Sequence, residues 1–382
     1  MPFRLPSSRI NWTNSSFLIG VFVATCTAVP AYLWNYGVDW FQGGLFLAFF
    51  SATGISITLG YHRLLAHMAF QARWPVRLFT LLFGAAAFEN AALNWVSDHR
   101  RHHKNVDSDN DPYDITKGFW HAHIGWILFK LEPEPPLDNV PDLRRDRLVM
   151  LQEKHYVPVA VGVGFVLPAL LGWLHGGATG ALGGFLLAGV ARVTAVQHMT
   201  FFINSLCHTI GRQPYSDKCS ARDSWIMALF TFGEGYHNYH HEFQHDYRNG
   251  VRWWHWDPTK WSIWTLEKIR LVRGLRRVPE EKVLLSQLAE TRRRLNERLA
   301  SGKTELNARL RELLQTSDAQ LPALGERWTA LKASYADRAE TLKAEYAERA
   351  GHQLDEARAA LAEIRREVHA ALNLLEMAAV AA

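Results

Sequence analysis

Long apolar stretches alternate with short polar connections over the first two thirds of the chain. No Asp, Glu, Lys or Arg occurs between Arg9 and Asp39, between Asp39 and Arg63, or between Lys154 and Arg192. A helix needs about 20 apolar residues to cross a bilayer. Four segments reach that length, and they predict membrane-spanning helices over residues 16–35, 41–60, 156–174 and 179–203. The expected fold is therefore all-α and lies in a lipid bilayer.

The distribution of Lys and Arg predicts how these spans are oriented. The four spans form two hairpins, and their connections at 36–40 and 175–178 contain neither Lys nor Arg. Basic residues are concentrated at the opposite ends, in residues 4–9 and 63–154. By the positive-inside rule, both termini and the segment between the hairpins lie in the cytoplasm. That segment and residues 204–278 are expected to form a helical cap on the cytoplasmic side of the membrane, either the bacterial inner membrane or the endoplasmic reticulum.

Two further segments are expected at the membrane boundary. The apolar stretch 74–96 contains Glu89, Asn90 and Asn94 near its end, so we expect a helix embedded in the cytoplasmic leaflet and not a fifth span. Five tryptophans lie between Trp253 and Trp264, interleaved with Arg252 and Lys260. This pattern favours anchoring at the interface over ligand stacking.

The composition changes at about residue 279, which predicts two domains, a membrane domain at 1–278 and a charged extension at 279–382. The extension has leucines at intervals of three, four and seven residues, including Leu288, Leu295, Leu306 and Leu310. This pattern indicates helical hairpins or a short coiled coil. A solvated helical tail without a partner remains an alternative.

Charge and cysteine content narrow the function classes. The formal net charge is +5 and the pI is about 9.1, but no motif that reads a nucleic-acid groove is present, so the basic residues are expected beside anionic lipid and no nucleic-acid partner is expected. The three cysteines are widely spaced and form no CxxC pair. They predict neither a disulfide framework nor a thiolate metal site.

Histidines carry the strongest chemical signal. Of 18 histidines, eight fall in three clusters, HRLLAH at 62–67, HRRHH at 99–103 and HNYHH at 237–241. Positions i, i+3 and i+4 share one face of a helix, so each HxxHH motif is expected to point its imidazoles toward one place. A ninth candidate, His208, follows Asn204 by one helical turn. Nine imidazoles are too many for one ion, and they predict a dimetal centre at the cytoplasmic membrane boundary.

The three boxes, the run NSLCH at 204–208 and the run GEGYHNYHH at 233–241 resemble the membrane fatty-acyl desaturase family. The similarity extends over about residues 15–275 and is greatest to acyl-CoA delta-9 desaturases of the stearoyl-CoA type. The resemblance implies two non-haem Fe2+ ions and an O2-dependent oxidoreductase of fatty acid biosynthesis. It also implies ten metal-site residues: His62, His67, His99, His102, His103, His208, His237, His240 and His241 as ligands, with Asn204 acting through a water.

The resemblance also implies where the acyl chain binds. Trp95, Asp98, Thr200 and Phe201 are the expected substrate contacts, since Trp95, Thr200 and Phe201 occupy positions similar to the kink region of the family. Animal acyl-CoA members have Arg at the position of Ser97, where it helps to hold coenzyme A. No HPGG haem motif of a fused cytochrome b5 occurs, so the electron donor is expected to be a separate ferredoxin, rubredoxin or cytochrome b5.

These observations predict a desaturase that places a cis double bond, at the ninth position, in a saturated acyl-CoA. Two alternatives use the same di-iron centre, namely desaturation of an acyl-lipid and hydroxylation of an alkyl chain. A third belongs to another class, a membrane-anchored scaffold whose histidines bind structural metal. A scaffold does not need nine imidazoles, and this argues against it.

Overall fold

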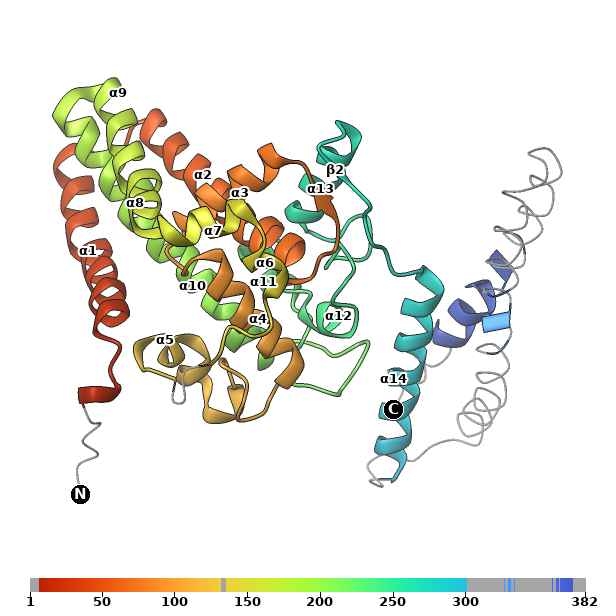
Figure 1. Ribbon diagram of the computed structural model, residues 1–382. Coiled ribbons are helices and arrows are strands. Elements are labelled where there is room, and N and C mark those ends of the chain that lie inside the picture. Colours follow the sequence, from red (N-terminus) through yellow and green to blue (C-terminus); the bar gives the residue numbers. More distant parts are fainter. Residues whose placement is uncertain are drawn as a thin grey trace, which may run out of the picture. The chain divides into compact units, whose positions relative to one another are not determined.

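The computed structural model describes residues 7–131 and 135–300, with residues 326, 329, 330, 333, 359, 362, 363 and 365–373. Nearly all regular structure in these residues is helical (Figure 1). The first half contains η1 (Ser7–Arg9), α1 (Trp12–Tyr36), α2 (Trp40–Ile55), η2 (Ser56–Ala66), β1 (Gln71–Ala72), α3 (Trp74–Ala85), α4 (Ala92–Asn105), η3 (Ile115–Lys117), η4 (His121–Gly125), α5 (Trp126–Leu128), α6 (Pro141–Arg144) and α7 (Arg147–Lys154). The second half contains α8 (Tyr156–Val161), η5 (Gly162–Val166), α9 (Leu167–Gly183), η6 (Gly184–Ala191), α10 (Arg192–Ser205), η7 (Leu206–His208), α11 (Trp225–Phe230), α12 (His237–Glu242), α13 (Pro258–Lys268), β2 (Val272–Arg273) and α14 (Glu280–Ala300).

The first two long helices begin at polar caps. The side chain of Asn11 accepts a hydrogen bond at the start of α1, and Asp39 forms a capping box with Gln42 at the start of α2. Such caps satisfy backbone N–H groups that have no partner inside the helix. Beyond Ile55 the helix continues through η2, whose turns are π-helical, and ends at Ala66. The second long helix therefore continues six residues beyond the end of the span expected at 41–60, and it includes His62.

The third long helical run reverses direction in its middle. It extends from Tyr156 to His208 over 53 residues, which would measure roughly 80 Å if it were straight. Helical geometry fails at Gly176 and Gly177, where Gly177 has a φ of 58°. Gly172 and Gly180 then meet so closely that a Cβ on Gly172 would lie 2.1 Å from the carbonyl oxygen of Gly180. Glycine thus permits both the turn and the contact between the two arms.

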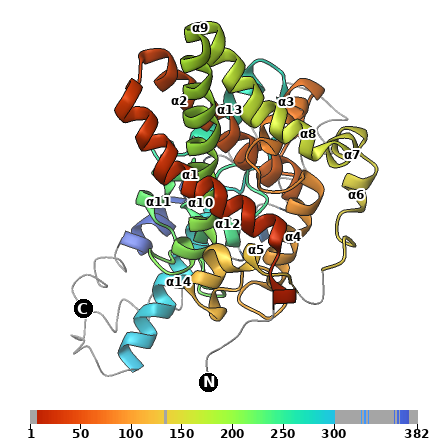
Figure 2. The same cartoon turned by 90° about the vertical axis from the view of Figure 1, so that its left-hand side faces the viewer.

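Three helical runs in the described residues are long and apolar enough to cross a membrane, namely Trp12–Tyr36, Trp40–Ala66 and Tyr156–His208. The arms of the third run pack against α1 and α2, so these helices lie side by side (Figures 1 and 2). Exposed apolar side chains, such as Phe22, Leu47 and Trp173, cover their outer surface. A surface of this kind is suited to lipid.

The prediction of a single helix over residues 74–96 is wrong. Helix α3 ends at Ala85 and α4 begins at Ala92, and between them Phe88 and Asn90 have left-handed φ values of 57° and 86°. Partners from α10 hold the turn, since Arg192 donates to the carbonyl of Ala86 at 2.5 Å and Gln197 to that of Phe88 at 2.9 Å. Hydropathy does not reveal this break, because the turn residues Ala86–Phe88 are themselves apolar.

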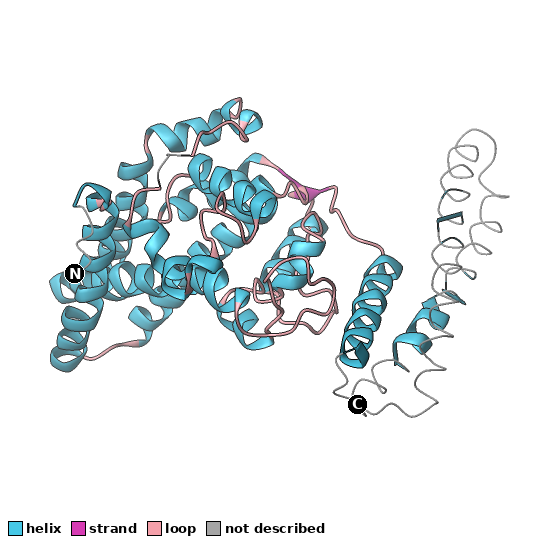
Figure 3. Cartoon of the chain, turned by 90° about the horizontal axis from the view of Figure 1, so that it is seen from below, coloured by secondary structure: helices cyan, strands magenta, loops and turns pink. Residues whose placement is uncertain are grey.

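A small antiparallel ribbon joins two distant segments. Strand β1 pairs with β2, with Gln71 opposite Arg273 and Ala72 opposite Val272 (Figure 3). A buried apolar core beside it includes Tyr61, Val96 and Ile263. This core joins η2, α4 and α13, and η2 and α4 carry the first two histidine boxes.

The chain divides into two compact units, Met1–Gln213 with Lys218–Arg277 and Pro214–Asp217 with Val278–Ala382. In the second unit, Ser286 of α14 donates to the carbonyl of Tyr215 at 2.8 Å, and Leu288 and Leu295 are buried. The later leucines of the pattern, such as Leu306 and Leu310, lie outside the described residues. The coiled coil therefore stays a prediction.

Candidate metal centre

Nine histidines from four parts of the chain converge into two groups. In each group the candidate ligand atoms all lie within 4.8 Å of one another. The group of five consists of His62, His67, His99, His103 and His240, and the group of four consists of His102, His208, His237 and His241. These are the nine histidines singled out in the sequence.

The two HxxHH motifs lie on helices, as expected, but each serves both groups. On α4, His99 and His103 belong to the group of five, and His102 belongs to the group of four. On α12 the pattern is reversed, because His240 joins the group of five while His237 and His241 join the group of four. Residues i and i+4 lie almost above one another, whereas i+3 is turned to the side. The expectation that each motif points at one place is therefore wrong.

Within each group the Nε2 atoms face one another. In the group of five, Nε2 of His62 lies 3.0 Å from that of His240, and Nε2 of His67 lies 2.8 Å from that of His99. In the group of four, Nε2 of His208 lies 3.1 Å from that of His237. Two ligands bound at right angles, with metal–nitrogen bonds of about 2.1 Å, would be separated by about 3.0 Å. The spacing thus fits neighbouring ligands of one ion.

Burial keeps six of these imidazoles neutral. Because they are buried beside other histidines, the pKa values of six of them lie well below the ordinary 6.5: His67, His99, His103, His237, His240 and His241. Neutral imidazole is the form that binds metal ions. These six side chains can therefore bind a metal without first losing a proton at neutral pH.

His102 shows most directly that the residues fit a metal. Its Nδ1 lies 2.8 Å from Oδ1 of Asp111, a contact that places the ring hydrogen on Nδ1. Its Nε2 is buried without a hydrogen-bond partner among the described residues. A buried nitrogen without a partner is costly, and a metal ion in the group of four would satisfy it.

His208 is held through a hydroxyl. Its Nδ1 lies 2.7 Å from Oγ of Ser220, and that hydroxyl donates to Oδ1 of Asp107 at 2.5 Å. The backbone N–H of Ser220 also donates to Asp107, at 2.6 Å. This chain of bonds fixes the ring so that Nε2 faces the group of four.

Glu234 supports the group of five. Its Oε2 lies 3.0 Å from Nδ1 of His62, and Arg63 donates to its Oε1 at 2.9 Å. Arg63 is itself buried and is paired with Asp257 at 3.0 Å. Burial opposes ionisation of Glu234, but His62 and Arg63 beside it hold the pKa of its carboxyl below the ordinary 4.5. The carboxylate therefore stays charged and orients His62.

The sequence alone did not predict the four residues that support the histidines, namely Asp107, Asp111, Ser220 and Glu234. Asp107 and Asp111 belong to the acidic run DSDND, which begins four residues after the second box. Glu234 lies three residues before His237 in GEGYHNYHH. A carboxylate close to a histidine ligand is a usual orienting partner, so both positions gave a usable signal. Ser220 gave none, because its contact depends on tertiary folding.

Two of the expected substrate contacts, Trp95 and Thr200, are linked to the centre through Glu89 and His99. The ring of Trp95 stacks on that of His99, with centroids 4.9 Å apart. Oε2 of Glu89 accepts a hydrogen bond from Nε1 of Trp95 at 3.3 Å, and its Oε1 accepts one from the Thr200 hydroxyl at 2.8 Å. Burial raises the pKa of Glu89 to about 8. Phe201, the next residue on α10, is buried.

Asp98 and Asn204 lie beside the histidines in the chain. Asp98 is half-buried on α4, and burial raises the pKa of its carboxyl to about 6, which Arg101 partly opposes. Asn204 is half-buried in the last turn of α10, four residues before His208. Neither His198 nor His245 belongs to either group. His245 instead donates from Nδ1 to the carbonyl of His67 at 2.9 Å.

Comparison with known proteins places these features in a family. Residues 38–268 match the family model described as "Fatty acid desaturase". The chain is 38% identical over 298 residues to acyl-CoA desaturase 1 of Saccharomyces cerevisiae, covering 76% of this chain and 56% of that protein. It is 35% identical over 265 residues to human stearoyl-CoA desaturase, covering 68% and 71%. It is 33% identical over 275 residues to the sn-1 stearoyl-lipid 9-desaturase of Anabaena variabilis, covering 70% and 94%.

The aligned regions differ in extent. The chain spans about half the length of two yeast relatives, 56% of the Saccharomyces cerevisiae protein and 49% of a probable acyl-CoA desaturase of Schizosaccharomyces pombe. The match to the cyanobacterial protein covers nearly all of that protein. All three histidine boxes lie within residues 38–268, the region that matches the family model.

Proposed function

Because the chain belongs to the fatty acid desaturase family, we propose that it converts a saturated fatty acyl chain into a cis-monounsaturated one. The observation that carries the proposal is the pair of histidine groups, one of five and one of four, beside the half-buried Trp95. The reaction takes one hydrogen from each of two adjacent methylenes. With O2, two electrons and two protons, the products are the alkene and two waters.

The nine histidines are proposed to hold two iron ions, one in each group. When bound, the iron pair supplies the O2-dependent oxidation of an unactivated C–H bond, which no side chain can perform. Imidazole nitrogen without thiolate suits iron in a redox centre. Asp111, Ser220 and Glu234 orient the ligands His102, His208 and His62. Asn204 is proposed to hold a water at the edge of the group of four.

The acyl chain is proposed to bend beside Trp95 and Thr200. Glu89 connects these two side chains across α4 and α10, so it keeps the wall of the site rigid next to His99. Phe201 adds apolar surface, and Asp98 is the polar contact toward the head of the substrate. Holding two methylenes at fixed positions is the main contribution of the protein, because orientation decides which bond reacts.

The substrate proposed is a saturated acyl-CoA, desaturated at the ninth position, and the relatives named acyl-CoA and stearoyl-CoA desaturase support it. The alternative is an acyl-lipid, as in the name of the cyanobacterial relative. Ser97 favours neither, because its buried hydroxyl donates to Oδ1 of Asn139 at 2.7 Å and offers no cation for coenzyme A. A hydroxylase with the same metal centre is the remaining alternative.

We propose that four spans cross the bilayer, the two arms of the Tyr156–His208 run counting separately. The absence of Lys and Arg from residues 36–40 and 175–178 supports a cytoplasmic centre. The activity is assigned to residues 1–278. A separate ferredoxin, rubredoxin or cytochrome b5 is proposed as the electron donor, and residues 279–382 as a helical extension outside the catalytic part.

The experiment is expression of the full chain in a host that lacks its own delta-9 desaturase, followed by gas chromatography with location of the double bond. New delta-9 monounsaturated acids support the proposal, and the His237→Ala variant should produce none while reaching the membrane at wild-type level. Hydroxy acids without alkenes would replace desaturation by hydroxylation. Labelled stearoyl-CoA given to membranes with a supplied reductase then distinguishes the two acyl carriers, because only an acyl-CoA enzyme releases labelled oleoyl-CoA.

A further inference from the structure

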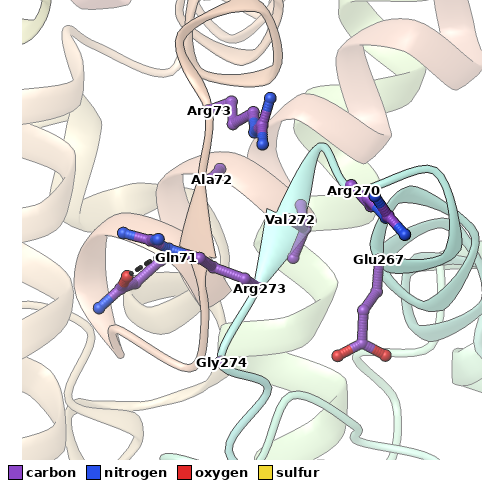
Figure 4. A pocket seen from close by; sticks show the side chains of 8 residues that line it. All are labelled: Gln71, Ala72, Arg73, Glu267, Arg270, Val272, Arg273 and Gly274. Carbon is purple, nitrogen blue, oxygen red and sulfur yellow. Dashed lines mark hydrogen bonds between the residues drawn. The ribbon is translucent and has the colours of Figure 1, made fainter.

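A basic cavity lies outside the two histidine groups. It has a volume of about 710 Å³ and is formed where the β1–β2 ribbon meets the start of α3 and the end of α13 (Figure 4). Its lining consists of Gln71, Ala72, Arg73, Glu267, Arg270, Val272, Arg273 and Gly274. Residues about 200 positions apart in the chain therefore build one concave surface, and the ribbon fixes their register.

The cavity carries an excess of positive charge. Arg73, Arg270 and Arg273 line it together with a single acid, Glu267. Nε of Arg273 donates to Oε1 of Gln71 at 3.1 Å. Among the described residues no ion pair joins these arginines to a carboxylate. Arg73 and Arg270 come from the two sides of the ribbon in Figure 4, while the Glu267 carboxylate is directed away from Arg73.

The backbone of Arg270 is strained in a way that places its side chain at the cavity. Arg270 follows the last turn of α13 and has a φ of 61°, in the left-handed region. Its N–H donates to the carbonyl of Glu267 at 2.9 Å, and the N–H of Leu271 donates to that of Leu266 at 2.9 Å. Helices usually end in this way with glycine. An arginine held there points to a function for its side chain.

Exposed apolar side chains flank the arginines. Trp74 is 68% exposed, Trp264 is 51% exposed and Ile269 is 60% exposed. Nζ of Lys268 lies 5.2 Å from the centre of the Trp264 ring. Tryptophan next to a basic side chain is typical of the interface between lipid headgroups and acyl chains. Guanidinium groups recognise phosphate oxygens through paired hydrogen bonds.

We propose that this cavity binds the phosphate of a phospholipid headgroup, with Arg73 and Arg270 as the main contacts. The lipid's acyl chains lie along Trp74, Trp264 and Ile269. Arg273 adds charge at the ribbon and is positioned by Gln71. A soluble phosphate would use the same guanidinium groups but would leave these apolar side chains uncovered, and this favours the lipid.

The proposal is tested by native mass spectrometry of the full chain, purified in dodecyl maltoside and stripped of lipid. Three probes are compared: dioleoylphosphatidylglycerol, dioleoylglycerol, which has the same acyl chains and no phosphate, and inorganic phosphate, which has no acyl chains. The wild type should bind the first in preference to the other two. Arg73→Gln and Arg270→Gly should each lower that affinity about tenfold, the loss expected for one charge-assisted contact.

Arg270→Gly also separates binding from folding. Glycine adopts the left-handed φ freely, so this variant should unfold at the wild-type temperature or above it while binding less lipid. Arg145→Gln removes one exposed charge directly after α6, outside the cavity, and serves as the matched control. Equal affinity for the phospholipid in all four proteins would overturn the proposal. Binding of inorganic phosphate as strong as that of the phospholipid would also overturn it, in favour of a soluble ligand.

Discussion

Nδ1 of His102 lies 2.8 Å from Oδ1 of Asp111, and this contact turns the unpartnered Nε2 of the same ring toward the group of four. Asp111→Asn should therefore loosen metal binding without removing a ligand. Loss of such an orienting carboxylate typically lowers metal affinity by about 10–100-fold. Competition with a chelator, followed by metal analysis, measures the change. Asp109→Asn, which alters an exposed carboxylate of the same run, should have no effect.

The two groups should differ in their tolerance to the loss of one ligand. His67→Ala leaves four imidazoles in the group of five, whereas His208→Ala leaves three in the group of four. We expect His67→Ala to keep close to two irons per chain and His208→Ala to keep close to one. Metal analysis of purified protein, with Mössbauer spectra to separate the irons, provides the measurement. Equal losses in both variants would contradict the division into two groups.

Glu89 should make stability depend on pH. Its pKa rises from the ordinary 4.5 to about 8 because the carboxyl is buried. Between these values the folded protein holds a proton that the unfolded chain releases, so this contribution is present below pH 4.5 and is lost as the pH rises to about 8. The loss amounts to at most about 1.4 kcal/mol per pH unit.

Glu89→Gln is the variant that isolates this contribution. Glutamine keeps an acceptor for Thr200 and cannot titrate. Thermal unfolding of both proteins in detergent between pH 5 and pH 8 should give curves that approach or cross as the pH rises, because only the wild type loses the contribution of Glu89. Parallel curves would show that this carboxyl has an ordinary pKa. Comparing the two proteins cancels the titration of Asp98 and the histidines.

The hairpin of the third helical run should be sensitive to the side chain at position 172. A Cβ at position 172 would lie 2.1 Å from the carbonyl oxygen of Gly180, so Gly172→Ala must push the two arms apart. Overpacking of this kind costs roughly 1–3 kcal/mol. Gly162→Ala is the control, since a Cβ there meets nothing within 4 Å. Unfolding temperatures in detergent should fall for the first variant only.

The long helices could be predicted because each contains a long stretch without charged residues. The run without charge that follows Asp39 leads into a helix that the structure extends to Ala66. The break between α3 and α4 could not be predicted, since it depends on bonds from Arg192 and Gln197 to backbone carbonyls. A side chain more than 100 positions away in the sequence leaves no local signal at the turn.

The histidines of the candidate centre could be identified from their spacing in the sequence. Their division into a group of five and a group of four could not be predicted in this way. All nine histidines were identified by the repeated boxes and by His208, one turn after Asn204. Their assignment to groups depends on how α4 and α12 face each other, which is a property of packing. Ser220, the partner of His208, could not be predicted either. Its position depends on tertiary folding, because its hydroxyl is held by Asp107, 113 positions away in the sequence.

Because α4 and α12 each contribute histidines to both groups, the centre can be completed only late in synthesis. Each group contains members of both α4 and α12, so the group of five is complete only after residue 240 and the group of four only after residue 241. Before that point the nascent chain offers only five of the nine imidazoles, once the first two boxes have been made, and six after His208. We therefore expect metal loading to follow translation of the third box. A ribosome stalled after the last long helix would hold a membrane-inserted chain with an unfinished centre.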